Sequence, residues 1–144
     1  MPALPSSIPR GAAVALVFGA VLGLTGVAAG AFGAHALRDT VSPRDLEIWK
    51  TAAHYQQLHA GLLVGVAALG CVQWSRALRV STVALVVGIL VFAGTLDAMV
   101  LGGPRILGAV TPVGGLCLMG GWLSLLVHGV TLLKSAGSRT MSEG

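Results

Sequence analysis

Four long stretches of this chain are almost free of charged side chains. Residues 11–37, 51–75 and 106–133 contain no Asp, Glu, Lys or Arg, and residues 80–104 contain only Asp97. Charged residues make up 10% of the chain and hydrophobic residues 55%, whereas soluble domains carry roughly 25% charged residues. A helix of about 20 residues crosses the hydrocarbon core of a bilayer. Each stretch exceeds that length, so the sequence predicts four membrane-spanning helices.

The expected fold is an all-α membrane protein, with four transmembrane helices in one antiparallel bundle. We expect residues 11–134 to form a single transmembrane domain. Its helices are expected at about 11–37, 43–74, 80–101 and 112–134. Residues 1–10 include three prolines and two serines, a composition typical of a disordered leader. Residues 135–144 are short and polar, and we predict a flexible tail.

The basic residues predict contact with lipid headgroups rather than with nucleic acid. The net charge is +4, but the basic side chains are scattered singly near helix ends, where they anchor and orient a membrane protein. On the side of the termini they are Arg10, Arg76, Arg79, Lys134 and Arg139. On the other side they are Arg38, Arg44, Lys50 and Arg105. Counting five against four under the positive-inside rule, we expect both termini in the cytoplasm.

The first apolar segment has an alternative interpretation as a signal peptide cleaved near Ala28–Ala31. Its apolar run is longer than the roughly 7–15 residues of a typical signal-peptide core, so we favour a retained first helix. The chain has two cysteines. Cys71 and Cys117 are expected near opposite membrane surfaces, and we interpret both as small buried residues rather than a disulfide.

Glycines recur in the first predicted helix at alternating steps of four and three residues. Such steps return to one helical face, and close approach of a neighbouring helix is the usual reason for small residues inside a membrane. The second predicted helix carries a similar stripe. We therefore expect the two stripes to meet at a close crossing. The expected packing residues are Gly19, Gly23, Gly26, Gly30 and Gly33 on the first helix, and Gly61, Gly65 and Ala68 on the second.

Two helix starts carry a capping signature. Ser42 is followed by Pro43, a residue suited to the first helical turn, and Asp45 lies where it can complete a capping box. The charged residues that follow predict an amphipathic N-terminal extension of the second helix, outside the hydrocarbon. Thr111 and Pro112 repeat the cap-and-proline pattern for the fourth helix. The alternative is a longer fourth helix that kinks at Pro112.

Polar side chains gather on the membrane side opposite the termini. An antiparallel arrangement of four helices places there His35, His54, Tyr55, His59, Asp97 and Arg105. An ionisable residue at membrane depth is costly and suggests a functional site. For Asp97 we favour relief by headgroup water or by a salt bridge with Arg105. The alternatives are a proton-relay or ion-coordinating role and a contact with a partner protein.

The histidines do not match a catalytic or metal-binding motif. His59 lies one turn after Tyr55 on the same face, which favours a structural hydrogen-bonded pair. His35 and His59 are weak candidates for metal ligands. Haem ligation by two histidines is a further alternative, and no nucleophile has a charged activator nearby in sequence. We therefore predict no cofactor and no enzymatic activity.

Several short strings in fixed order resemble a known family. They are Gly30-Ala31-Phe32-Gly33-Ala34-His35; Trp49, Thr51, Tyr55, Gln56 and His59; Phe92, Gly94 and Leu96; Thr111-Pro112-Val113-Gly114-Gly115; and Gly121-Trp122. The chain resembles the YgdD-like family of small uncharacterised inner-membrane proteins, over nearly its whole length except the first ten and last few residues. The resemblance implies four membrane helices and no established activity.

The resemblance marks His35, Tyr55, His59 and Pro112 as motif positions. Asp97 departs from the family pattern, in which a tyrosine is the commoner occupant, so we expect any role of Asp97 to be particular to this protein. The leading hypothesis is a non-enzymatic accessory or scaffold subunit in the bacterial inner membrane, bound to a membrane-protein partner or to copies of itself. One alternative is a small-solute, proton or metal-ion carrier using Asp97, His35 and His59. The other is a haem- or metal-binding redox subunit.

Overall fold

The computed structural model describes residues 7–140, with side chains to residue 136, and is helical apart from short connections. Its four long helices are α1 (Arg10–Phe32), α2 (Pro43–Val72), α3 (Arg76–Val100) and α4 (Thr111–Thr140). A π-helical turn, Gly33–Leu37, extends α1, and a 3-10 helix, Arg105–Ala109, precedes α4. All four segments are long and apolar enough to cross a membrane. The predicted all-α, four-span fold is confirmed.

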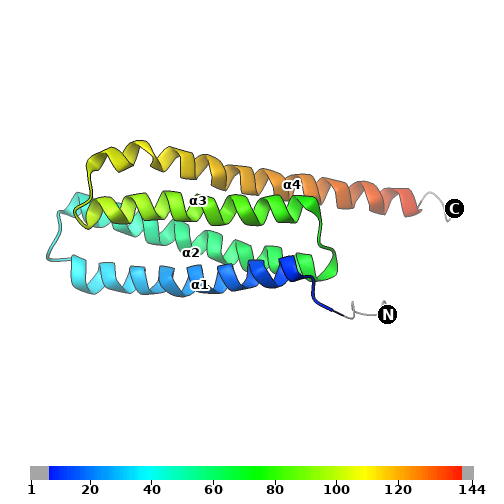
Figure 1. Ribbon diagram of the computed structural model, residues 1–144, viewed down its shortest axis with the longest axis horizontal. Helices are drawn as coiled ribbons and strands as arrows, with labels where there is room; N and C mark the ends of the chain where they lie inside the picture. Colours follow the sequence, from blue (N-terminus) through cyan, green and yellow to red (C-terminus); the bar gives the residue numbers. More distant parts are fainter. Residues whose placement is uncertain (1–6, 141–144) are drawn as a thin grey trace.

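The helices pack in chain order, with α1 on α2, α2 on α3 and α3 on α4. Figure 1 shows them running back and forth, with the start of α1 and the end of α4 at the same end of the molecule. Helix α4 lies along α3 and does not close the bundle onto α1. Helices α2 and α4 therefore flank α3 without covering it. This open arrangement creates the groove described below.

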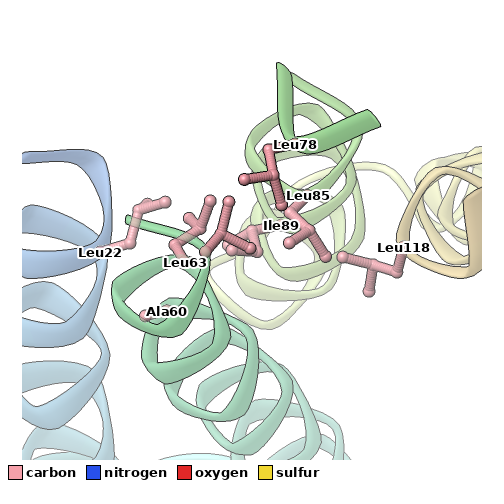
Figure 2. Packing of buried hydrophobic residues seen from close by; sticks show 8 residues of the cluster. Leu22, Ala60, Leu63, Leu78, Leu85, Ile89 and Leu118 are labelled. Carbon is pink, nitrogen blue, oxygen red and sulfur yellow. The ribbon is translucent and has the colours of Figure 1, made fainter. Parts of the chain in front are cut away.

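The core lies where the inner faces of the four helices meet. Figure 2 shows Leu22 of α1 and Leu63 of α2 facing α3, while Leu118 approaches α3 from α4. The buried cluster comprises Leu22, Ala60, Leu63, Val66, Leu78, Leu85, Ile89 and Leu118. Many large apolar side chains point outward instead, including Leu24, which is 74% exposed. An apolar exterior of this kind suits lipid rather than water.

The start of α2 is fixed by a local hydrogen-bond exchange. The hydroxyl oxygen of Ser42 accepts the backbone N–H of Asp45 at 3.1 Å and donates to the carboxylate of Asp45 at 2.8 Å. Pro43 occupies the first helical position. The two side chains are thus bonded directly to one another, and the predicted helix start at residue 43 is confirmed.

Helices α2 and α3 are joined by a shorter connection than predicted. The hydroxyl of Ser75 accepts the backbone N–H of Leu78 at 3.2 Å, so α3 begins at Arg76 instead of residue 80, and α2 ends at Val72 instead of residue 74. At its other end α3 stops in a Schellman motif. Gly102 has a positive φ of 98°, and the N–H of the next residue returns to Ala98 O at 2.8 Å.

Two predictions about the last helix are wrong. Thr111 does not stand before α4 as a cap but is its first residue, and its hydroxyl donates back to Leu107 O at 3.3 Å. The helix also continues to Thr140, through most of the predicted tail, because no proline interrupts it. The remaining tail residues 141–144, and residues 1–6 of the predicted leader, lie outside the described chain.

Candidate functional site

The glycine face of α1 receives large side chains from α2. A Cβ at Gly26 would lie 3.0 Å from Cγ of Gln57, and one at Gly19 would lie 3.1 Å from the carbonyl oxygen of Ala60. Gly23 and Gly30 also face α2, and the indole of Trp49 occupies the space where a Cβ of Gly33 would sit. The five glycines therefore form a channel along α1 that α2 fills.

The side chains that fill this channel also bond to its backbone. The amides of Gln56 and Gln57 donate at 3.0 and 2.7 Å, and the indole N–H of Trp49 donates at 2.7 Å. The acceptors are the backbone carbonyl oxygens of Leu22, Gly26 and Ala29. Glycine exposes the helix backbone, so these donors reach carbonyl groups that longer side chains would cover.

The predicted partner stripe on α2 is wrong. A Cβ added at Gly61 or Gly65 would meet nothing within 4 Å, and Ala68 is exposed. The face of α2 that contacts α1 is displaced around the helix, toward Trp49, Gln56 and Gln57. The reason is that large amides and an indole, not small residues, fit the channel of α1. The small residues of α2 are left on the outer face.

Three of the six predicted polar residues meet in a groove between α2 and α4. His54, Tyr55 and His59 line this groove of about 710 Å³, with α3 as its floor. The other lining residues are Leu58, Phe92, Pro112, Gly115, Leu116, Leu118, Met119 and Trp122. His35 is exposed on the π-helical turn, and neither it nor Asp97 lines the groove.

His59 is the buried polar centre of the groove, with only 4% of its surface exposed. Its Nδ1 lies 2.7 Å from the carbonyl oxygen of Tyr55, one turn earlier. A carbonyl only accepts, so Nδ1 carries the hydrogen. Nε2 is then the acceptor and faces the indole N–H of Trp122 at the long distance of 3.4 Å. The expected pairing with Tyr55 therefore runs through the backbone rather than the phenol.

Aromatic rings form one wall of the groove. The ring of Tyr55 stacks on Phe92, with centroids 4.6 Å apart, and lies 5.8 Å from the ring of His59. His59 is about 24 Å along α2 from Pro43 and about 20 Å from Val72, at 1.5 Å per residue. His59 and the groove around it therefore lie near the middle of α2.

The expected link between Asp97 and Arg105 is absent from the described residues. Arg105 instead donates to the carboxylate of Asp45 at 2.7 Å, which joins the 3-10 helix before α4 to the start of α2. Oδ1 of Asp97 is buried and has no hydrogen-bond partner in residues 7–136. Of the carboxylates of Asp45 and Asp97, the one that pairs with Arg105 is Asp45, which lies outside the apolar segments.

The described residues contain no group of three or more His, Cys, Asp or Glu side chains that could hold a metal ion. Nδ1 of His128, near the opposite end of the bundle, faces Ser75 Oγ at 3.1 Å. Cys71 and Cys117 are both free thiols. Trp122 and Gln57 were missed as site residues, although Trp122 belongs to one of the strings that carry the family resemblance.

Together, the four apolar spans, the polar donors buried between them and the groove open to lipid define a small multi-pass membrane protein. The family described as "Protein of unknown function (DUF423)" matches residues 29–115, more than half of the chain. The chain belongs to this family. The predicted resemblance is confirmed.

The relatives are membrane proteins of similar length. A UPF0382 membrane protein of Staphylococcus epidermidis is 39% identical over 127 residues, covering 86% of this chain and 98% of the relative. Another, from Staphylococcus saprophyticus, is 36% identical over 116 residues, covering 79% of this chain and 94% of the relative. The inner membrane protein YgdD of Escherichia coli is 34% identical over 127 residues, covering 85% and 94%.

These relatives and the four apolar helices place the chain in the bacterial inner membrane as a multi-pass protein. No solved structure matches the chain.

Proposed function

We propose that this protein is a non-enzymatic accessory subunit that binds a transmembrane helix of a partner protein along the outer face of α2. The observation that carries the proposal is the open surface at Gly61 and Gly65, where a Cβ would meet nothing within 4 Å. Glycine disfavours a helix by about 1 kcal/mol relative to alanine. Packing within the chain explains the glycines of α1 but offers no reason for these two.

The open glycines belong to a regular seam. We define the α2 seam as His54, Leu58, Gly61, Gly65 and Ala68, which recur at steps of four and three residues and are all exposed. This period favours a second helix packed at a shallow left-handed angle, and small residues let two membrane helices approach closely. The seam has the length and the spacing to hold one helix.

His54 supplies a second reason to expect a protein partner. Its imidazole is exposed on the seam and makes no hydrogen bond among the described residues. Its ring makes an edge-to-face contact with the ring of Tyr55. Lipid chains offer no hydrogen-bond partner, whereas polar side chains of neighbouring helices do. We therefore propose that the partner helix carries a polar side chain opposite His54.

The test is photo-cross-linking from Ala68 in native membranes, with a double variant, Gly61→Leu and Gly65→Leu. We expect one cross-linked membrane protein that is lost in the double variant. Gly94→Leu on α3 and Gly120→Leu on α4 are matched controls, since both glycines also face open space, and they should leave the product intact. A product consisting of two copies of this chain would replace the accessory role with a homo-oligomer. Cross-links to lipid alone in the parent protein would refute docking.

We also propose that both termini lie in the cytoplasm. The support is the five-to-four distribution of basic residues and the position of the start of α1 and the end of α4 at one end of the bundle. Reporter fusions after Thr140, and in the connection between α1 and α2, should give opposite signals. A periplasmic signal from the Thr140 fusion would reverse the orientation.

The carrier and redox alternatives receive less support from the geometry. A carrier built on Asp97, His35 and His59 needs these side chains on one path, and only His59 lines the groove. For haem or metal, the other candidate ligand, His35, does not line the groove with His59.

A further inference from the structure

The groove between α2 and α4 shares His54 and Leu58 with the α2 seam, but its polar centre, His59 and Trp122, lies outside the seam and is not explained by the accessory role. We propose that the groove binds the hydroxylated aromatic headgroup of a membrane-soluble molecule of the hydroquinone class.

The polar pair at the centre of the groove is suited to one hydroxyl group. Nε2 of His59 is an acceptor, the indole N–H of Trp122 is a donor, and the two nitrogens lie 3.4 Å apart, longer than the usual 2.9–3.0 Å. A hydroxyl is both donor and acceptor. One oxygen can lie within about 2.9 Å of both nitrogens, donating to His59 and accepting from Trp122. A carbonyl could satisfy only Trp122, and a hydrocarbon chain neither.

The surroundings favour an aromatic ring beside that hydroxyl. Tyr55 and Trp122 are 39% and 49% exposed, and both line the groove. Stacked or edge-to-face rings attract one another beyond the effect of the area they bury. The hydroxyl of Tyr55 has no hydrogen-bond partner in residues 7–136, so it is available to a second oxygen on the same ring. A para-dihydroxylated ring carries such a second oxygen.

Depth and size select a lipid-soluble molecule. The groove lies near the middle of α2 and is flanked by exposed apolar side chains such as Leu116 and Met119. Its volume of about 710 Å³ falls in the usual range for ligand sites, about 300–1,000 Å³. A ligand would enter sideways from the bilayer, with its apolar tail remaining among the lipid chains.

The test compares two probes in nanodiscs: a benzohydroquinone with a decyl tail, and its dimethyl ether, which has no hydroxyl hydrogen. We expect the hydroquinone to bind at least about tenfold more tightly than the dimethyl ether, which corresponds to one hydrogen bond between uncharged groups. The oxidised quinone should bind with intermediate affinity because it cannot donate to His59. Equal affinity for hydroquinone and dimethyl ether would overturn the proposal.

Variants then locate the site. His59→Leu removes the acceptor of the hydroxyl hydrogen, so it should reduce the hydroquinone-to-ether preference to near one. Trp122→Phe removes a donor that both probes can use, so it should weaken the binding of both and leave most of the preference. His128→Gln changes the other buried histidine, outside the groove, and should leave the preference unchanged. A preference that survives His59→Leu would show that the hydroxyl is recognised elsewhere and would refute the assignment.

A filling variant keeps the proposal testable if the buried variants do not fold. Met119 lines the groove and is 61% exposed, while Leu126 on the same helix is 62% exposed and does not line it. Met119→Trp should abolish hydroquinone binding, and Leu126→Trp should leave it intact. Equal binding by both variants would place the ligand outside the groove.

Discussion

The α1–α2 pair and the α3–α4 pair both place glycines at a close helix contact, but they use them differently. On α1 the glycines open a channel in which the amides of Gln56 and Gln57 bond to the backbone. Between α3 and α4 the glycines receive apolar side chains and backbone. A Cβ at Gly121 would lie 2.7 Å from Cγ of Leu85, and one at Gly114 would lie 2.5 Å from the backbone nitrogen of Phe92.

A glycine face determines how closely two helices approach but not the chemistry of the contact. The α1–α2 contact includes several hydrogen bonds between the helices, whereas the α3–α4 contact depends mainly on shape. The latter has few cross-helix hydrogen bonds among the described residues, such as that from Ser124 Oγ to Ala77 O at 2.8 Å. Shape-dependent packing tolerates added volume poorly, while a polar contact is sensitive to the loss of a donor.

The largest effect is expected at Gly114. Gly114→Ala would press its Cβ against the backbone of Phe92 at 2.5–2.8 Å, and backbone atoms of two packed helices cannot move independently. We expect the free energy of unfolding to fall by about 3 kcal/mol, the upper part of the usual range for overpacking. Reversible unfolding in mixed micelles measures it.

The adjacent glycine supplies the control for this prediction. A Cβ at Gly115 would lie 3.9 Å from the ring of Phe92, an ordinary contact. Gly115→Ala should therefore leave the protein as stable, or up to about 1 kcal/mol more stable, through its better helix propensity. Equal losses for Gly114→Ala and Gly115→Ala would contradict the close α3–α4 approach.

The next effect tests the polar contact of the α1–α2 pair. Gln56 donates to Leu22 O at 3.0 Å and to Thr25 Oγ1 at 2.7 Å. Gln56→Leu preserves the approximate volume and removes both bonds. We expect a loss of about 1 kcal/mol, since interhelical hydrogen bonds in membranes average roughly 0.6 and reach about 1.7 kcal/mol.

A double-mutant cycle separates this bond from packing. Thr25→Val combined with Gln56→Leu should show a coupling energy of about 0.5 kcal/mol or more. Thr131→Val is the matched control, because the Thr131 hydroxyl donates only to Val127 O of its own helix at 2.8 Å. Strict additivity of Thr25→Val and Gln56→Leu would mean that the amide contributes by filling space alone.

The difference between the α1–α2 and α3–α4 contacts also explains how much of the fold could be predicted from the sequence. Charge-free stretches indicate the four spans because the bilayer penalises charge wherever it lies along a helix. The glycine period of α1 correctly indicates a packed face. It does not indicate what packs there, because a channel accepts either a small-residue helix or long amides. Gln56 and Gln57 carry no periodic signal that distinguishes them from other polar residues.

The site was less predictable for a related reason. His59 and Trp122 are separated by 63 residues, and Arg105 and Asp45 by 60, so no local spacing links either pair. Their meeting depends on the order of the helices and on how each is rotated about its axis. Tyr55 and His59 lie one turn apart, so their proximity can be inferred from local spacing, although the bond between them uses the backbone carbonyl of Tyr55.

A third prediction concerns polar atoms that lack partners. Oδ1 of Asp97 and Oγ of Ser81, both on α3, are buried without a hydrogen bond in the described residues, whereas Gln56 at the α1–α2 contact is paired. Asp97→Leu should raise the free energy of unfolding by about 1 kcal/mol, because an unsatisfied buried polar group is removed. Thermal unfolding in detergent provides the measurement.

Ser81→Ala is the milder companion variant. Loss of its hydroxyl removes a polar group and leaves only a small void, so we expect a change within about 0.5 kcal/mol. A destabilised Asp97→Leu protein would show instead that the carboxylate has a partner in the membrane, and would revive the hypothesis that Asp97 acts in binding or proton transfer.

The smallest effect is expected on the outer face of α2, which neither helix pair uses. Gly61→Ala and Gly65→Ala add a methyl group into open space, so the stability of the isolated protein should stay constant or rise by less than about 1 kcal/mol. Gly26→Ala is the buried comparison, since its Cβ would lie 3.0 Å from Gln57 and 3.3 Å from Gln56. A clear loss at Gly61 or Gly65 would indicate that these glycines pack within the chain. Suppose that replacing both Gly61 and Gly65 by leucine leaves the stability unchanged but removes the cross-linked partner. These two glycines would then bind another helix, in contrast to the glycines of α1 that hold the fold together.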